Sequence, residues 1–153
     1  MTDQRRETPA RATFRLMYRS RDRLPVEDRE TELGDLFATS RSNNNKRNIT
    51  GALLLSGHRF VQVLEGAETD LRPLFTSIQK DPRHSDVEVL YEGPADERIF
   101  AHWSMAKVAI ADADLPLIAQ IGELSTVDTP RMTPAKKRLL DVMRQAIDAA
   151  PTT

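Results

Sequence analysis

The chain has 153 residues, 39% hydrophobic and 29% charged, which is ordinary for one globular domain with its own core. A net charge of −1 gives no field that would attract nucleic acid or an anionic membrane, and no apolar run could span a bilayer. The absence of cysteine excludes disulfides and thiolate chemistry, and it fits a reducing cytoplasm. The three histidines lack ligand spacing, so we expect no metal site.

The first strand is predicted from Thr13 to Ser20, where alternation puts Tyr18 on the same face as its apolar neighbours Phe14 and Leu16. Residues 1–12 are charged and contain no apolar stretch, so we expect a mobile arm and not a signal peptide. A helix follows from about Glu27 to Ser42, with apolar residues at helical spacing. The polar run that comes next suits a helix end and turns.

Two hairpin strands come next, Ile49 to Ser56 and Phe60 to Leu64, and Glu65-Gly66 is expected to end the second. Gln62 lies between two apolar residues on one face of that second strand, so we expect its amide to be buried. A buried amide without partners costs about 1–3 kcal/mol. Reversing a glutamine amide hardly changes its shape but exchanges an acceptor for donors, so Gln62 can act as a hydrogen-bond switch.

The remaining elements complete a βαββαββ order. A second helix is capped by Thr69 or Asp70, with Pro73 in or near its first turn. The fourth strand contains Val87, Val89 and Tyr91, and the fifth runs near Trp103 to Ala109. This order predicts an α+β, ferredoxin-like sheet with two helices on one face. Two C-terminal helices, one beginning at Asp114 and one at Thr133-Pro134, are expected to cover the other face.

Several polar motifs follow one another along this framework. Each is weak alone, but the ordered set is specific: Tyr18-Arg19-Ser20, Ser42-Asn43-Asn44, Phe60-Val61-Gln62-Val63-Leu64-Glu65-Gly66, Asp81-Pro82-Arg83-His84 and Trp103-Ser104-Met105. From about Phe14 to Val108 the chain resembles the BLUF family, blue-light sensors that bind flavin. The resemblance implies a flavin-binding domain at 13–110. The helical extension at 111–153 is similar to that of short, stand-alone members.

The resemblance also implies a cofactor and its ligands. FAD would lie with its ring between the two sheet-facing helices, with FMN or riboflavin as alternatives. Asn44 would bind the polar edge of the ring, with Asn43 close to it. Arg83 and His84 would reach the pyrimidine side or the ribityl chain, and Asp81 is a weaker candidate.

The light-driven step implied by the resemblance begins at Tyr18, which would give an electron to the excited flavin. A proton would follow through the Gln62 amide, and a rotated or tautomerised amide would remain after recombination. Trp103 and Met105 would lie on the fifth strand, near Gln62, and relay its state outwards. No enzyme activity is expected, and a cysteinyl adduct is impossible in a chain without cysteine.

Two other functions share the predicted topology: a regulatory module that binds a colourless ligand, and an acylphosphatase-type hydrolase. The hydrolase needs an anion-binding loop, and no glycine-rich loop follows the first strand. Neither explains Gln62. Residue by residue, Tyr18 could be a core tyrosine, the asparagines could end a helix, and Trp103 and Met105 could be packing residues.

No output enzyme fits after Val108, so we expect the signal to pass to a separate protein or through a homo-oligomer, unless the chain is a fragment of a longer receptor.

Overall fold

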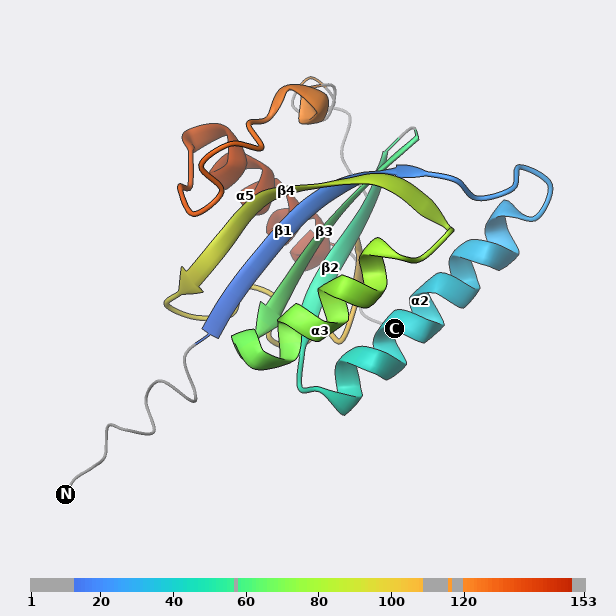
Figure 1. Cartoon of the computed structure of the whole chain (residues 1–153), viewed down its shortest axis with the longest axis horizontal. Helices are drawn as coiled ribbons and strands as arrows, with labels where there is room; N and C mark the ends of the chain where they lie inside the picture. The colour runs from blue at the N-terminus through green and yellow to red at the C-terminus, as the bar shows by residue number, and fades with distance from the viewer. Residues whose placement is uncertain (1–12, 57, 109–115, 117–119, 150–153) are drawn as a thin grey trace.

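The computed structural model describes residues 13–56, 58–108, 116 and 120–149. Its centre is a five-stranded sheet with the strand order β4-β1-β3-β2-β5 (Figure 1). The first four strands form antiparallel ladders, and the short fifth strand runs parallel to its neighbour. The strand bounds are β1 Thr13–Asp22, β2 Thr50–Ser56, β3 Arg59–Gly66, β4 His84–Ala95 and β5 Ala106–Val108.

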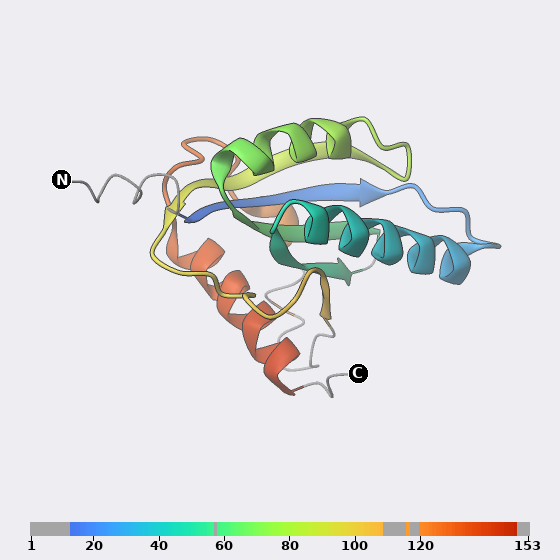
Figure 2. The ribbon, with the colours of Figure 1, turned by 90° about the horizontal axis from the view of Figure 1, so that it is seen from below.

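The helices form a layer on each side of this sheet. Figure 2 shows α2 (Arg29–Lys46) and α3 (Glu68–Gln79) on one face and α5 (Pro134–Ala149) on the other. Side chains alternate between the two faces of the sheet and form two separate cores. Phe60 and Leu64 face α2 and α3, whereas Val61 and Val63 face α5. The predicted α+β, ferredoxin-like architecture is confirmed.

The end of α2 differs from the prediction. The helix runs to Lys46 instead of Ser42, so Asn43 and Asn44 lie inside its last turns rather than after it. Asparagine is a weak helix former, but Asn44 is buried and its amide binds the Ser104 carbonyl, so tertiary contacts outweigh the local preference. The turn comes later, at Asn48, whose φ of 55° lies in the left-handed region.

Two boundaries around the β3–α3 connection were also predicted wrongly. Strand β3 does not end at Leu64, because Glu65 and Gly66 are its last two residues and remain paired with β1. Helix α3 begins at Glu68, before both predicted caps, because the amide groups of Asp70 and Leu71 close its first turn on the Ala67 carbonyl. Pro73 therefore lies in the interior of the helix, not in its first turn.

The segment before β5 and the C-terminal region contain further differences. Strand β5 begins only at Ala106, so Trp103 and Met105 precede it. The predicted helix from Asp114 lies mostly outside the described residues, and the described part ends in a 3₁₀ turn at Ile121–Glu123. The second C-terminal helix, α5, begins where it was predicted. Its apolar stripe is buried against the sheet: Leu139, Leu140, Met143 and Ile147.

Glu65 explains why β3 continues. Its side chain is fully buried on the α5 side, where the carboxylate accepts a hydrogen bond of 2.8 Å from Nε of Arg15. It also accepts from the backbone N–H groups of Ile99 at 3.0 Å and Phe100 at 2.9 Å. One carboxylate therefore joins two strands to the chain segment that leads towards β5.

We expect Glu65→Gln to lower the free energy of unfolding by about 2–4 kcal/mol. The substitution keeps the shape, but it leaves Arg15 without a counter-charge and turns an amide NH₂ towards groups that can only donate. Urea unfolding followed by circular dichroism would measure the loss. The matched control is Glu68→Gln on the exposed face of α3, where the ion pair to Arg72 is worth at most about 1 kcal/mol. Equal stability of the two variants would contradict this role of Glu65.

Candidate functional site

A pocket opens between α2, α3 and the face of the sheet that they cover. Apolar side chains such as Leu36, Phe60 and Leu74 form much of its walls, and polar groups converge from both helices, from β1, β3 and β4, and from the α3–β4 loop. All seven side chains for which the sequence predicts cofactor contacts line it: Tyr18, Asn43, Asn44, Gln62, Asp81, Arg83 and His84. The fold thus brings together residues that lie up to 66 positions apart in the chain (84 − 18).

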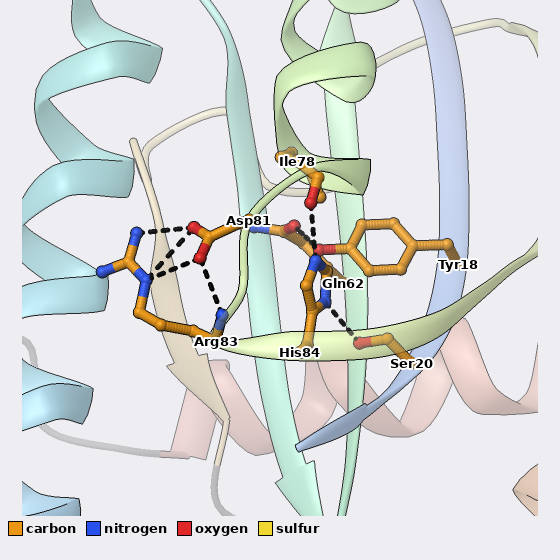
Figure 3. Close-up of polar contacts among 7 residues, drawn as sticks. All are labelled: Tyr18, Ser20, Gln62, Ile78, Asp81, Arg83 and His84. Atoms are coloured by element: carbon orange, nitrogen blue, oxygen red, sulfur yellow. Dashed lines mark hydrogen bonds and ion pairs between the residues drawn. The ribbon is translucent and has the colours of Figure 1, made fainter. Parts of the chain in front are cut away.

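Tyr18 and Gln62 lie together in the sheet wall of this pocket. They are directly paired across β1 and β3, and the Tyr18 hydroxyl donates to Oε1 of Gln62 (Figure 3). Their exposed fractions are only 3% and 4%, so the contact is shielded from bulk solvent. A register shift in the β1–β4 ladder between Met17 and Tyr18 marks the same point, and such irregularities re-aim side chains.

Burial keeps the Tyr18 phenol in its neutral form. It raises the pKa of Tyr18 far above its ordinary value, and the negative charge of Asp81 adds to the effect. The hydroxyl is therefore a proton donor at every physiological pH. Ring contacts with Phe75 and His84, at centroid distances of 5.5 and 6.0 Å, fix the plane of the phenol.

The other end of the Gln62 amide meets a sulfur atom. Nε2 of Gln62 donates to Sδ of Met105 at 3.5 Å. A thioether is a weak acceptor and has no proton to give, so the observed orientation satisfies both ends of the amide. Reversing the amide would turn Oε1 towards the sulfur and lose that contact. Because the sulfur bond is weak, the bond that the Tyr18 hydroxyl donates to Oε1 is the main contact that favours this orientation.

Trp103 and Met105 face opposite sides of the sheet, although they are two residues apart. Met105 is buried with the apolar core under α2 and touches Gln62. Trp103 is partly buried against the core under α5, and its carbonyl accepts from the N–H of Gly51 at 3.0 Å. Of the two predicted relay residues, the structure therefore gives only Met105 a polar contact with Gln62.

His84 connects β1 with the end of α3. Nε2 lies 2.6 Å from the Ile78 carbonyl, and Nδ1 lies 2.7 Å from the Ser20 hydroxyl (Figure 3). A carbonyl can only accept, so Nε2 carries a proton. The Ser20 hydroxyl is then free to donate to Nδ1, an arrangement that suits the neutral ring. Sequence reasoning missed Ser20 as a site residue, although it is part of the Tyr18-Arg19-Ser20 motif.

An ion pair lies at the rim of the pocket. The Arg83 guanidinium binds Asp81 through Nη2 at 2.6 Å and Nε at 3.0 Å. Its hydrogen bond lowers the pKa of Asp81, and Asp81 in turn raises the pKa of Arg83, with smaller contributions from Glu32 and Asp35 on α2. The rim therefore presents a fixed cation whose charge is largely balanced within the protein.

Two side chains of α2 fasten this helix to the segment before β5. Nδ2 of Asn44 donates to the Ser104 carbonyl, and Nε of Arg41 donates to the Met105 carbonyl at 3.2 Å. Sequence reasoning found Asn44 but missed Arg41, whose partner lies 64 residues away. Because Met105 also touches Gln62, these bonds join the pocket's α2 wall to its floor.

The described residues contain no group of three or more histidine, aspartate or glutamate side chains that could hold a metal ion. Within the same residues, no helix is both long and apolar enough to cross a membrane.

The family model for BLUF, described as sensors of blue-light using FAD, matches residues 13–106. The chain belongs to the BLUF family. A BLUF domain is a flavin-binding photoreceptor, a sensor and not a catalytic unit. This match favours neither the colourless-ligand module nor the acylphosphatase-type hydrolase.

Curated BLUF relatives are much longer proteins. Photoactivated adenylate cyclase subunit alpha of Euglena gracilis is 36% identical over 99 residues, which are 65% of this chain and 10% of that protein. Subunit beta of Euglena longa is 36% identical over 91 residues, which are 60% of this chain and 11% of that protein. The chain therefore spans about a tenth of the length of these relatives.

Solved BLUF structures share the fold over most of the chain. The ground state of BlsA superposes with a TM-score of 0.75 at 28% identity, covering 92% of this chain and 91% of BlsA. BlrB, a BLUF protein in its dark state, superposes with a TM-score of 0.67 at 31% identity, covering 91% of this chain and 97% of BlrB. The likeness extends past the domain matched by the family model into the C-terminal region.

Proposed function

We propose that this protein is a blue-light receptor that uses FAD, with Tyr18 and Gln62 as its photoactive switch. The observation that carries the proposal is the buried hydrogen bond between these two side chains in the pocket wall. Tyr18 is suited to give an electron to an excited flavin, because a phenol is a good one-electron donor. Once it has lost the electron, the phenol becomes strongly acidic and can also release its proton. Among the described residues, Gln62 is the hydrogen-bond partner of this hydroxyl.

The pocket residues fit a flavin. Apolar side chains from α2, β3 and α3 offer flat walls to a planar ring, while Asn43 and Asn44 offer amide groups to its polar edge. His84 lines the same pocket, with its two ring nitrogens held by Ser20 and Ile78. Arg83 at the rim suits the more polar part of the cofactor. FAD rather than FMN is proposed on the description of the family. Mass spectrometry of the flavin released by acid identifies which of the two is bound.

When bound, the flavin supplies a strong one-electron oxidant under blue light. Tyr18 would be the electron donor, and its phenolic proton would follow through the Gln62 amide, entering at Oε1 along the hydrogen bond already in place while Nε2 gives up a proton towards the flavin. When the electron and the proton return, no covalent bond has changed. The amide of Gln62 is then able to settle in the reversed or tautomeric form, because Met105 holds the starting orientation only weakly.

The signal that leaves the site is small in energy. One rearranged hydrogen bond changes the free energy by roughly 1 kcal/mol, and couplings between sites are typically about 1–3 kcal/mol. The output is therefore a shift between two populated states. We propose that it reaches a separate protein or a second copy of the chain. The proposed cytoplasmic location is supported by the absence of cysteine from the sequence.

Absorption spectra of the purified protein, taken in the dark and under blue light, test the proposal. We expect the bands of a bound flavin to move slightly to the red on illumination and to return in the dark, because the hydrogen bonds to the ring change while its redox state does not. Failure to bind flavin after reconstitution would refute the receptor function. Bound flavin that only bleaches would leave the cofactor in place and remove the Tyr18–Gln62 switch.

A further inference from the structure

We propose that Arg19 couples the Tyr18–Gln62 pair to the C-terminal segment, by holding the turn at 121–124 against the far face of the sheet. The inference rests on the proposed function, because it concerns where the light signal goes. Nη1 of Arg19 donates to the Ile121 carbonyl at 2.8 Å and to the Leu124 carbonyl at 2.9 Å.

Arg19 is the neighbour of Tyr18 on β1, so the two side chains leave opposite faces of the same strand. Tyr18 enters the pocket and is paired with Gln62, whereas Arg19 is paired with Val61 and points to the α5 side. The two residues share one peptide unit. A shift of the β1 backbone at Tyr18 therefore moves the base of the Arg19 side chain.

The Arg19 guanidinium is well placed to transmit such a shift. The residue is only 8% exposed, and Nε donates to Glu88 on β4 at 2.9 Å while Nη1 holds the turn. A guanidinium is a rigid planar fork, so its bonds to two carbonyls fix direction as well as distance. Ile121 and Leu124 are themselves buried in the core under α5, so the turn moves together with that core.

A second arginine ties the same turn to the other strand of the switch pair. Arg59, at the start of β3, lies against Gly122, where a Cβ atom would come within 2.6–2.8 Å of the guanidinium. A larger residue at this position would displace the end of the Arg59 side chain from the turn. The turn thus touches β1 through Arg19 and β3 through Arg59, and these two strands carry Tyr18 and Gln62. A displacement of one strand relative to the other would strain the turn.

The docked C-terminal segment also contains a destabilising group. Lys136 in α5 is fully buried, and Nζ has no hydrogen-bond partner among the described residues. Burial lowers the pKa of Lys136, Asp128 opposes this effect, and the positive charge of Arg19 adds to it. A buried amine without a partner weakens the docking of α5, so less free energy is needed to shift the balance between its docked and undocked states.

Hydrogen exchange of the full-length, flavin-loaded protein, measured in the dark and under blue light, tests the coupling. In the wild type we expect faster exchange under light in peptides covering 120–143. In Arg19→Met we expect the red shift of the flavin to persist, because Arg19 lies outside the pocket, and the difference between light and dark in these peptides to be lost. The matched control is Arg98→Met, which removes a guanidinium bound to the Asn48 carbonyl, away from the turn.

Arg19→Lys separates coupling from mere loss of structure. It keeps the charge and the buried stem but replaces the fork with a single ammonium. Dark exchange at 139–143 is expected to stay within about twofold of the wild type, with at least half of the light-minus-dark difference lost. An undiminished difference in both Arg19 variants would overturn the proposal. So would a wild type that shows the red shift without any change at 120–143, whereas a wild type without the red shift would refute the receptor function instead.

Discussion

Tyr18→Phe is expected to bind flavin and to lose the persistent red shift completely. The substitution removes one oxygen atom from a buried ring whose contacts with Phe75 and His84 are otherwise kept. The phenyl ring cannot donate a proton to Gln62 and is a far poorer electron donor than a phenol. The pocket should remain intact, because most of its lining comes from other residues.

Light-minus-dark difference spectra measure this result, and the chain offers a matched control. Its only other tyrosine, Tyr91, is also buried, but it lies on the opposite face and donates to the Pro94 carbonyl at 3.0 Å. Tyr91→Phe should therefore keep a normal red shift. A normal photocycle in Tyr18→Phe would rule out Tyr18 as the donor.

Gln62→Leu is the second substitution with a large expected effect: flavin still binds, but no red shift forms on illumination. Leucine has nearly the size of glutamine but has no amide that could reverse. The Tyr18 hydroxyl loses its acceptor and Met105 its donor, so we also expect the free energy of unfolding to fall by about 1–3 kcal/mol.

The same difference spectra, together with thermal unfolding, test this variant. Gln79→Leu is a suitable control, because it removes an exposed amide at the end of α3, outside the pocket lining. If Gln62→Leu retained the shift of the wild type, the amide would have to be removed from the mechanism and a different group sought beside Tyr18.

Period-two alternation explains why the sequence predicted the sheet and the buried amide of Gln62 well. Residues 60–65 alternate between two faces, and the structure gives the two faces separate cores. A buried amide at Gln62 on such a strand was therefore predictable, and it is observed. The partner of that amide was not predictable from β3 alone. The link to Tyr18 came from the resemblance to BLUF proteins. The family match confirms that the chain belongs to this family.

Long-range contacts explain most of what the sequence did not predict. The sequence predicts that β3 ends at Leu64, because the charge of Glu65 is visible in the sequence whereas its partner Arg15 lies 50 residues away. The faces of Trp103 and Met105 could not be assigned because the chain before β5 is not a strand, so alternation does not apply. Arg19 looked like an ordinary charged residue in a strand, since both carbonyls that it holds are more than 100 positions away.

The position of Trp103 gives the protein two intrinsic optical probes, one on each side of its sheet. This side chain is the only tryptophan, and it lies on the α5 side of the sheet. Indole emission therefore reports on the side to which the signal is proposed to travel, while flavin absorption reports on the pocket. Recording both after a single flash would time the passage of the signal through one sheet without any attached label.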